Sequence, residues 1–470
     1  MFDVIIIGGG PAGYIAAEFL GHKKKKVLLI ERENLGGTCL NFGCIPVKTL
    51  LNSAKKYVYA KEAEKFGINV QGVSYDWKAI QNRKTEVAAK LRRGIENRMK
   101  RFGVEIINGR GEIESPPSGE KPAIVKLYSP NGESRHEGKT VLVCAGSVPV
   151  TPPIPGVKDN PLVVDSSGLL DIESVPERIA VIGGGVIGIE FAALFSSLEC
   201  QVTVIEIMDE IIPFMDREQS PILRRAMKNV DFKLGCKVEK IENAAVRYTT
   251  KDGKHETLES DLVLLAAGRK PAPDTWGGKA AGIDITGSGV NIDDLMRTNI
   301  PRIWAAGDVT GKCFLAHCAY RMGEVAAADI LAALNGNITN ASRRDSRNRM
   351  RYNAIPWAVY GITEAAGIGL TEQEAEAKGI SIVKASLPMI MSGRFTAENS
   401  FADEGSVKVI ADAANRRILG IHAVGAYAPE FIWGGAALIE QEFRIDEVKQ
   451  LIFPHPTVSE LIRDTVRELE

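Results

Sequence analysis

Cys39 and Cys44 are the residues of this sequence whose type and spacing most strongly indicate chemistry. They lie in the segment GGTCLNFGCIPVKTLL, which begins at Gly36 and places four residues between the two cysteines. The segment predicts a glycine-containing turn that leads into a helix, and Pro46 suits the first turn of that helix because its missing N–H would have no partner there. The two sulfurs would then lie about one irregular turn apart, close enough for a disulfide if the backbone adapts. The alternative is two core cysteines without redox function, which are common in cytosolic proteins.

A glycine-rich nucleotide fingerprint precedes the cysteines and must position them. A predicted strand, Val4–Ile7, leads into GGGPAG, a helix follows, and a second predicted strand, Val27–Ile30, ends at Glu31. This strand, turn, helix and strand order is the context that the G-x-G-x-x-G fingerprint requires. Its glycines allow a pyrophosphate to approach the backbone at the helix N-terminus, and the carboxylate can accept hydrogen bonds from a ribose. The fingerprint glycines are Gly8, Gly10 and Gly13. A disulfide next to such a redox cofactor would be exchangeable and useful.

The same fingerprint occurs a second time. A predicted strand, Ile179–Ile182, is followed by Gly183, Gly185 and Gly188, a helix through Phe195, and a strand, Val202–Ile205, that ends at Glu206. The offset from the first copy is constant, since 183−8 and 206−31 both equal 175. Two dinucleotide sites in one chain can pass electrons from one cofactor to the other. Glu206 favours NAD over NADP, because a carboxylate binds the ribose 2′-OH and no basic residue is adjacent.

Composition and charge narrow the class of protein. The chain has 470 residues, which predicts two to four domains. Its 58 basic and 59 acidic residues give a net charge of −1, so no nucleic acid or anionic membrane is expected as a partner. Seven cysteines do not suggest a secreted disulfide framework. We expect no signal peptide, no membrane span and no metal site, and a cytoplasmic location.

The remaining chain supplies connecting elements and a separate terminal region. Trp77–Arg101 predicts a long exposed helix, and the Pro-rich stretch 149–156 predicts a linker. Two further strands end in Gly268 and in Gly307-Asp308, and a helix is expected to begin around residues 314–317. A charged stretch after about Asn340 separates a last region of mixed strands and helices. That region has no nucleotide motif, but it contains His455-Pro456-Thr457 followed by Glu460.

In this order, the motifs resemble those of the flavoprotein disulfide reductases, and among them most closely the dihydrolipoamide dehydrogenases, over essentially the whole chain. The segments that carry the resemblance are GGTCLNFGCIPVK, both fingerprints, AAGR at 266–269, AAGDV at 305–309, LAH at 315–317 and HPTVSE at 455–460. The resemblance implies an α/β fold with two Rossmann-like dinucleotide-binding domains, one for FAD and one for NAD, and a C-terminal α+β dimerisation domain. The implied boundaries are 1–148 and 270–348 for the FAD-binding domain, 149–269 for the NAD-binding domain and 349–470 for the dimerisation domain.

The resemblance also implies which residues contact the cofactors. For FAD they are Gly8, Gly10, Gly13, Glu31, Thr38, Lys48, Gly111, Asp308, Phe314, Leu315, Ala316 and His317. For NAD they are Gly183, Gly185, Gly188, Glu190, Glu206, Val238 and Gly268. Lys48 is similar to a family lysine that lies near the reactive edge of the flavin and pairs with a glutamate such as Glu190. A purely structural ion pair and, for Asp308, a helix N-cap are the alternative interpretations.

The activity implied is oxidation of protein-bound dihydrolipoamide to lipoamide, with reduction of NAD⁺ to NADH. His455 would be the base that takes the substrate's thiol proton, with Glu460 orienting it. The substrate thiolate would attack Cys39, and Cys44 would lie nearer the flavin. The family is homodimeric, and His455 would reach the cysteine pair of the other subunit. The partner would be a separate lipoyl-bearing chain, either the acyltransferase of a 2-oxoacid dehydrogenase complex or the lipoyl carrier of glycine cleavage.

Some positions depart from the family pattern, and other activities stay open. Phe453 stands where the family usually has histidine, and Thr363 where it has proline; IPVK replaces IPSK, and CAGS at 144–147 replaces ATGS. The alternatives are another NAD(P)H-dependent disulfide reductase of the family, a diaphorase that reduces quinones, or a non-catalytic flavoprotein. Glutathione-type reductases use NADPH, which Glu206 disfavours. Mercuric and large thioredoxin reductases need a cysteine pair near the C-terminus, and no cysteine follows Cys318.

Overall fold

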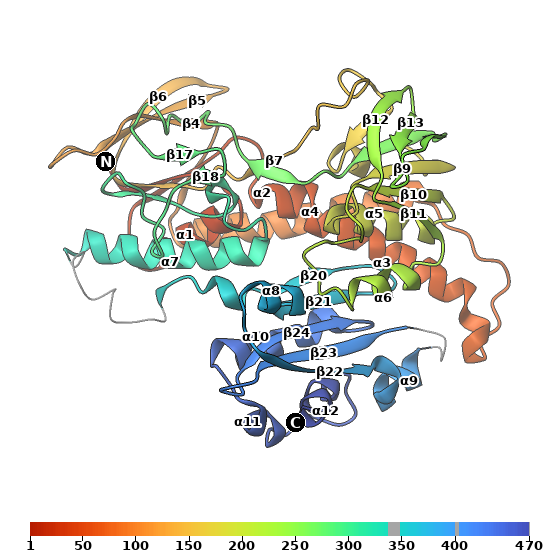
Figure 1. Cartoon of the computed structure of the whole chain (residues 1–470). Helices are drawn as coiled ribbons and strands as arrows, with labels where there is room; N and C mark the ends of the chain where they lie inside the picture. Colours follow the sequence, from red (N-terminus) through yellow and green to blue (C-terminus); the bar gives the residue numbers. More distant parts are fainter. Residues whose placement is uncertain (337–347, 400–403, 470) are drawn as a thin grey trace. The chain divides into compact units, whose positions relative to one another are not determined.

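The structure is a computed structural model that describes residues 1–336, 348–399 and 404–469 (Figure 1). The chain divides into two compact units. Unit 1 comprises Met1–Pro46, Asn82–Val150 and Arg269–Met350, and unit 2 comprises Val47–Gln81, Thr151–Gly268 and Arg351–Glu470. Helices α3 (Cys44–Lys61) and α4 (Trp77–Arg101) contribute residues to both. The predicted long helix is thus confirmed with its predicted bounds, whereas part of the charged stretch after Asn340 lies outside the described residues.

The core of unit 1 is a seven-stranded sheet that contains the first fingerprint. Its parallel strands are β3 (Glu105–Asn108), β2 (Val27–Glu31), β1 (Phe2–Ile7), β6 (Gly132–Val143) and β19 (Ile303–Ala305). The long strand β6 also pairs antiparallel with β5 (Ala123–Ser129), which pairs with β4 (Arg110–Ser115). Val4–Ile7 and Val27–Ile30 are almost fully buried, as expected of parallel strands covered on both faces. The strands predicted on either side of the first fingerprint are confirmed.

Unit 1 contains four helices in its described residues: α1 (Pro11–His22), α2 (Gly37–Phe42), most of α4, and α7 (Ala316–Leu334). Of these, α1 and α7 pack against this sheet. Helix α1 packs against α7, where Gly323 allows backbone contact because a Cβ there would meet the Ala12 carbonyl oxygen at 2.4 Å. Smaller elements complete the unit: β7 (Ser147–Pro149) pairs with β16 (Arg269–Pro271), β17 (Ile285–Thr286) pairs with β18 (Gly289–Val290), and a 3-10 turn spans Asp308–Thr310.

Unit 2 repeats the same design around the second fingerprint. Five parallel strands lie in the order β11 (Val230–Leu234), β10 (Gln201–Glu206), β9 (Arg178–Ile182), β15 (Leu262–Leu265) and β8 (Val163–Asp165). Helix α5 (Val186–Ser197) connects β9 to β10, and Val47, Leu50 and Ala54 of α3 pack into the same buried cluster. A three-stranded antiparallel sheet, β12 (Lys237–Glu242), β13 (Ala245–Thr249) and β14 (His255–Leu258), follows β11. The strands predicted at the second fingerprint are therefore confirmed too.

The last part of unit 2 is an antiparallel sheet with helices. The strand order is β20 (Trp357–Val359), β21 (Ala365–Gly369), β24 (Ile418–Val424), β23 (Ser406–Asp412) and β22 (Ile382–Pro388). Helices α10 (Ala428–Glu440), α11 (Ile445–Lys449) and α12 (Glu460–Arg467) share one buried cluster with Val407, Val409 and Ile421. Alternate residues of these strands must point to the other face, because successive side chains of a strand alternate. The remaining short helices are α6 (Ser220–Ala226), α8 (Glu372–Ala377) and α9 (Gly393–Glu398).

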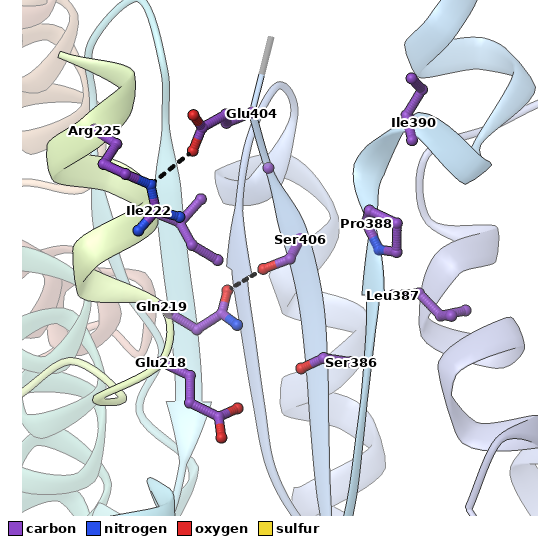
Figure 2. Close-up of a pocket in the computed structure, with 11 residues that line it drawn as sticks. Glu218, Gln219, Ile222, Arg225, Ser386, Leu387, Pro388, Ile390, Glu404 and Ser406 are labelled. Atoms are coloured by element: carbon purple, nitrogen blue, oxygen red, sulfur yellow. Dashed lines mark hydrogen bonds and ion pairs between the residues drawn. The ribbon is translucent and has the colours of Figure 1, made fainter. Parts of the chain in front are cut away.

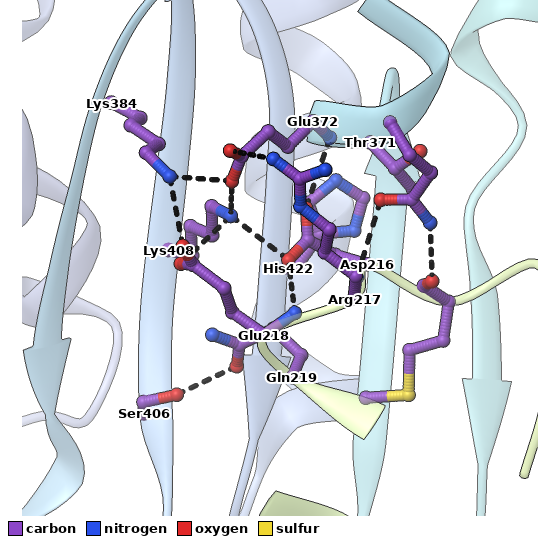
Figure 3. Close-up of polar contacts among 12 residues, drawn as sticks. Asp216, Arg217, Glu218, Gln219, Thr371, Glu372, Lys384, Ser406, Lys408 and His422 are labelled. Atoms are coloured by element: carbon purple, nitrogen blue, oxygen red, sulfur yellow. Dashed lines mark hydrogen bonds and ion pairs between the residues drawn. The ribbon is translucent and has the colours of Figure 1, made fainter. Parts of the chain in front are cut away.

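The other face of that sheet carries a buried ion cluster (Figure 3). Lys408 of β23 has no solvent exposure, and its ammonium nitrogen lies 2.9 Å from an Asp216 oxygen, 2.8 Å from Glu218 and 2.6 Å from Glu372. Burial would lower the pKa of Lys408, but its hydrogen bonds to these carboxylates outweigh burial and raise it. The three carboxylates lie close enough together to hold a metal ion, and in this structure the Lys408 ammonium bonds all three. The cluster joins the loop after β10 to the terminal sheet within unit 2.

Candidate active site

The cysteine segment folds directly against the first fingerprint within unit 1. Gly37 has φ +58°, and a Cβ on it would come within 2.7 Å of the Gly10 Cα. The Gly36 N–H donates to the Gly9 carbonyl oxygen at 2.9 Å. Only glycine allows both this backbone conformation and this approach. The segment that bears Cys39 is therefore fixed to the turn that would hold a pyrophosphate.

The two cysteines occupy different helices. Cys39 lies in α2 and Cys44 begins α3, with Gly43 between the helices, and both side chains are half-buried. The helix predicted after the glycine-containing turn is α3, with Pro46 in its first turn as expected, and a short helix that was not predicted, α2, precedes it. Gly43, between the two helices, takes the place of the predicted irregular turn.

A tyrosine pair that the sequence analysis did not identify lies near the cysteines. The Tyr14 hydroxyl donates to the Tyr320 hydroxyl oxygen at 2.7 Å, and the two rings meet edge to face. Burial raises the pKa of Tyr320, and the nearby Cys39 and Cys44 raise it further. Burial likewise raises the pKa of Tyr14, followed by its bond to Tyr320 and the charge of Cys39. Both phenols therefore stay protonated beside the cysteine pair. Tyr14 directly follows the fingerprint and could have been noticed, but Tyr320 gives no signal in the sequence.

The first fingerprint fits a dinucleotide. Gly8 has φ +107°, and a Cβ on Gly13 would lie 1.9 Å from the Gly8 carbonyl oxygen, so neither position accepts another residue. Gly10 precedes α1 without a side-chain cap, which leaves the helix N-terminus for an anion. The Glu31 carboxylate accepts from Gly9 N–H at 2.7 Å and from Glu33 N–H at 2.8 Å. Each oxygen has a further lone pair for a ribose hydroxyl.

The second fingerprint reproduces these contacts in unit 2. Gly183 has φ +110°, and a Cβ on Gly188 would lie 2.0 Å from the Gly183 carbonyl oxygen. Glu206 accepts from Gly184 N–H at 2.5 Å and from Met208 N–H at 2.8 Å. Gly185 precedes α5 without a side-chain cap. The two sites are thus equivalent in geometry as well as in sequence.

Other predicted NAD contacts lie in the same unit. Val238 is half-buried in β12, and Gly268 follows β15 with φ +97° and open space where a Cβ would be. Gly268 thus lies at the carboxyl end of a parallel strand, where ligands of such sheets bind, whereas Val238 belongs to the antiparallel sheet.

Asp308 is held by a chain of hydrogen bonds in unit 1. The Ser147 hydroxyl donates to its carboxylate at 2.6 Å, and Arg269 donates to the Ser147 hydroxyl and carbonyl oxygens at 2.8 Å each. Burial raises the pKa of Asp308, although Ser147 and Arg269 oppose that shift. A half-buried acceptor of this kind suits a sugar hydroxyl. Ser147 and Arg269 were not predicted as site residues, although both belong to the motifs that the sequence analysis noted.

The other predicted FAD contacts lie around these groups. Thr38 is half-buried in α2, and Gly111 is buried in β4, where a Cβ would press on Ile30 at 3.2 Å. Helix α7 begins at Ala316, so the expected helix start is confirmed within two residues. Leu315 is the N-cap residue, and Phe314 and His317 are exposed.

The predicted Lys48–Glu190 ion pair is present in unit 2. The Lys48 ammonium lies 2.7 Å from both carboxylate oxygens of Glu190, and it lies 4.6 Å from the centre of the Tyr360 ring. The Tyr360 N–H also donates to Glu190 at 3.2 Å. Burial raises the pKa of Glu190 despite the opposing effect of Lys48. The ion pair therefore fixes the orientation of the Lys48 side chain, which lies four residues after Cys44.

The terminal motif forms a His–carboxylate pair, also in unit 2. The His455 Nδ1 atom lies 3.1 Å and 3.2 Å from the two Glu460 oxygens, and its side chain is 79% exposed. Glu460 begins α12 and also accepts from Thr457 N–H at 2.9 Å. Burial alone would raise the pKa of Glu460, but these hydrogen bonds outweigh it and lower the pKa. The carboxylate therefore stays ionised, and the imidazole Nε2 atom is the one left to meet a substrate.

A pocket of about 420 Å³ lies elsewhere in unit 2 (Figure 2). Gln219 and Arg225 line it from one side, and Ser386, Pro388 and Ser406 line it from the terminal sheet. Ser406 donates to Gln219 at 2.6 Å across it. None of its lining residues in the described part of the chain was predicted for the site.

In the described ranges, no helix combines the length and apolar character needed to cross a membrane.

Comparisons with known proteins cover nearly the whole chain. Residues 2–323 match the family described as pyridine nucleotide-disulphide oxidoreductase, and residues 355–466 match the dimerisation domain of the same family. A dihydrolipoyl dehydrogenase of Bacillus subtilis is 33% identical over 98% of this chain and 97% of its own length. A dihydrolipoamide dehydrogenase of Chaetomium thermophilum is 36% identical over 98% of this chain and 90% of its own length.

Solved structures agree with these matches. LpdA from Mycobacterium tuberculosis has a TM-score of 0.86 at 25% identity, covering 100% of this chain and 99% of that one. The HOCl-induced flavoprotein disulfide reductase RclA from Escherichia coli has a TM-score of 0.83 at 26% identity, with both chains covered fully. The α/β fold with a dimerisation domain, as expected from the sequence, is therefore confirmed.

Proposed function

Because the chain belongs to the pyridine nucleotide-disulphide oxidoreductase family, we propose that it oxidises dihydrolipoyl groups and reduces NAD⁺. The observation that carries this proposal is that relatives named dihydrolipoyl dehydrogenase align with 98% of the chain, in which the cysteine pair and the His–Glu pair occur together. FAD and NAD are the cofactors. We assign FAD to residues 1–148 and 270–348, NAD to 149–269, and dimerisation to 349–470.

The chain's own residues account for proton and thiol chemistry. His455 takes the proton of a substrate thiol at Nε2, and ionised Glu460 stabilises the resulting imidazolium. The substrate thiolate attacks Cys39 of the oxidised pair, so that a substrate–Cys39 bond forms and the Cys39–Cys44 bond breaks. The second substrate thiol then displaces Cys39 and closes the lipoyl disulfide, leaving both cysteines reduced. FAD, when bound, supplies a two-electron relay from this dithiol to NAD⁺.

The partners follow from the same proposal. The dimerisation-domain match supports a homodimer, in which His455 of one subunit serves the cysteine pair of the other. The lipoyl group comes from a separate protein, the acyltransferase of a 2-oxoacid dehydrogenase complex or the lipoyl carrier of glycine cleavage. We place the enzyme in the cytoplasm, where most of its seven cysteines would stay reduced.

The test is NADH formation from dihydrolipoamide by the FAD-loaded protein, with NAD⁺ and NADP⁺ compared. We expect turnover with NAD⁺, much slower turnover with NADP⁺, and loss of both in Cys44→Ser. NADH-dependent quinone reduction should persist in Cys44→Ser, because it does not need the cysteine pair. If dihydrolipoamide is not oxidised while NADPH and another disulfide turn over, the substrate assignment is wrong.

A further inference from the structure

The pocket of unit 2 lies between helix α6 and the adjoining ends of β22 and β23 (Figure 2). Gln219, Ile222 and Arg225 recur at intervals of three residues, so they lie on one side of the helix, and this side lines the pocket. Opposite them, Pro388 ends β22 in register with Ser406, the first residue of β23. The volume of about 420 Å³ falls within the range of small-molecule sites, roughly 300–1,000 Å³. The pocket is therefore large enough for a small molecule and separate from the residues used above.

Gln219 has a buried amide that its protein neighbours satisfy only in part. The residue is 1% exposed, and its Oε1 atom accepts from the Ser406 hydroxyl at 2.6 Å. Among the residues that the structure describes, none accepts a hydrogen bond from its Nε2 atom, and Figure 2 shows this nitrogen directed into the space that the lining residues enclose. A buried donor that lacks an acceptor destabilises the folded chain. The pocket therefore has a place for an acceptor atom at this amide.

Arg225 is a cation with hydrogen-bonding capacity left over. Its Nε atom donates to a Glu404 oxygen at 3.1 Å, whereas no described residue accepts a hydrogen bond from its two Nη atoms. The other acid that lines the pocket, Glu218, is paired with the Lys384 and Lys408 ammonium groups at 2.8 Å each. Both acids of the lining are thus ion-paired. The polar groups left to bind a ligand are mainly hydrogen-bond donors, and one of them is charged.

Apolar side chains line the pocket beside these donors. They are Ile222 of α6, Pro388 of β22 and Ile390 of the short turn Met389–Met391. Ile390 is 44% exposed, so covering it removes apolar surface from water, which is favourable. A planar guanidinium binds a carboxylate through two parallel hydrogen bonds, and a nearby amide N–H can add a third. The lining therefore matches a carboxylate that carries a short apolar chain.

We propose that this pocket binds a monocarboxylic acid with a short branched apolar chain, at a site separate from the cysteine pair and from both fingerprints. The carboxylate accepts from the Gln219 amide and from the Nη atoms of Arg225. The chain of the ligand covers Pro388 and Ile390. A bound acid contacts both α6 and the terminal sheet, so it stabilises unit 2 against unfolding by mass action.

The test is calorimetric titration of the full FAD-loaded protein with 4-methylpentanoate. The matched probes are 4-methylpentanamide, which lacks the charge, and acetate, which lacks the chain. We expect the acid to bind at least about tenfold more tightly than either probe, because hydrogen bonds to a charged group are stronger than neutral ones and the chain buries apolar surface. The proposal is overturned if the acid does not bind, or if the amide or acetate binds as tightly.

Two substitutions locate the site, because they should shift the Kd of the acid in opposite directions. Arg225→Gln removes the cation and should weaken binding at least about tenfold. Glu404→Gln removes a competing carboxylate and should tighten binding, since the Arg225 guanidinium is then released to the ligand. The two side chains are 53% and 42% exposed, so both variants should keep the Tm of the unliganded protein. Shifts of the same sign, or no shift in Arg225→Gln, would show that the acid binds elsewhere and would overturn the proposal.

Discussion

At the scale of single residues, the chemistry depends on groups whose protonation is set by their neighbours. Glu460 stays ionised because the Thr457 N–H and His455 hydrogen bonds outweigh its burial. Tyr14 and Tyr320 stay protonated beside the cysteines because burial and the cysteine charge disfavour phenolate. An ionised carboxylate next to an exposed imidazole is the arrangement expected of a general base.

Replacing Glu460 by glutamine should lower kcat/KM for dihydrolipoamide by about 10²-fold or more and change its pH profile. The pKa of Glu460 is already low, so the carboxylate is charged wherever imidazole titrates. Without that charge the imidazolium is less stable, and the acid limb of the kcat/KM profile should move to lower pH. The measurement is initial rate against pH.

Asp464→Asn is the matched control for this change. Asp464 lies one turn further along α12 and bonds Arg463 at 2.9 Å rather than His455. Its profile should follow that of the unsubstituted enzyme. An unshifted acid limb in Glu460→Gln would remove the role we give to Glu460.

At the scale of elements, glycines and one buried lysine fix how the pieces meet. Gly37 allows the cysteine segment to lie on Gly10, and Gly13 and Gly188 let each nucleotide helix begin against its own turn. Lys408 of β23 bonds three carboxylates: Asp216 and Glu218 of the loop after β10, and Glu372, the first residue of α8 (Figure 3). A buried charge left without its partner costs far more than an exposed one.

Lys408→Met should therefore destabilise the protein by about 3–5 kcal/mol, because the fully buried Asp216 would lose the ammonium that it bonds and Glu372 would lose one of its cations. Lys384→Met is the control, since Lys384 bonds the same Glu218 and Glu372 but is 39% exposed. An exposed pair contributes only about 0–1 kcal/mol. Urea unfolding of the two variants measures the difference. Equal destabilisation would contradict the assignment of burial as the cause.

At the scale of the whole molecule, the cysteine pair and the base belong to different units of the chain, Cys39 and Cys44 to unit 1 and His455 to unit 2. The match to a dimerisation domain at residues 355–466 covers His455 and Glu460. In the homodimer that we propose, His455 of one subunit would serve the cysteine pair of the other, which accounts for its place in that domain.

Mixed dimers can test this sharing. Cys44→Ser and His455→Gln homodimers should each be inactive toward dihydrolipoamide. Heterodimers made by joint refolding or co-expression should recover up to half of the unsubstituted activity, because one of their two sites would have both an intact Cys44 and the intact His455 of the other subunit. If each subunit used its own histidine, both sites of the heterodimer would be damaged and no activity would return. Differently tagged subunits allow the heterodimer to be purified and assayed.

The sequence by itself determined the local geometry and much of the candidate site. Strand, glycine turn, helix and acidic strand end are neighbours along the chain, so both fingerprints could be read from spacing alone, as could the cysteine interval and the His455–Glu460 pair. The tertiary structure decided contacts between distant segments that the sequence did not indicate: Gly37 with Gly10, Tyr14 with Tyr320, and Lys408 with its carboxylates. It also decided that the buried Glu190 has a raised pKa and Glu460 a lowered one. Burial and hydrogen bonding set these properties, and both depend on segments that only folding brings together.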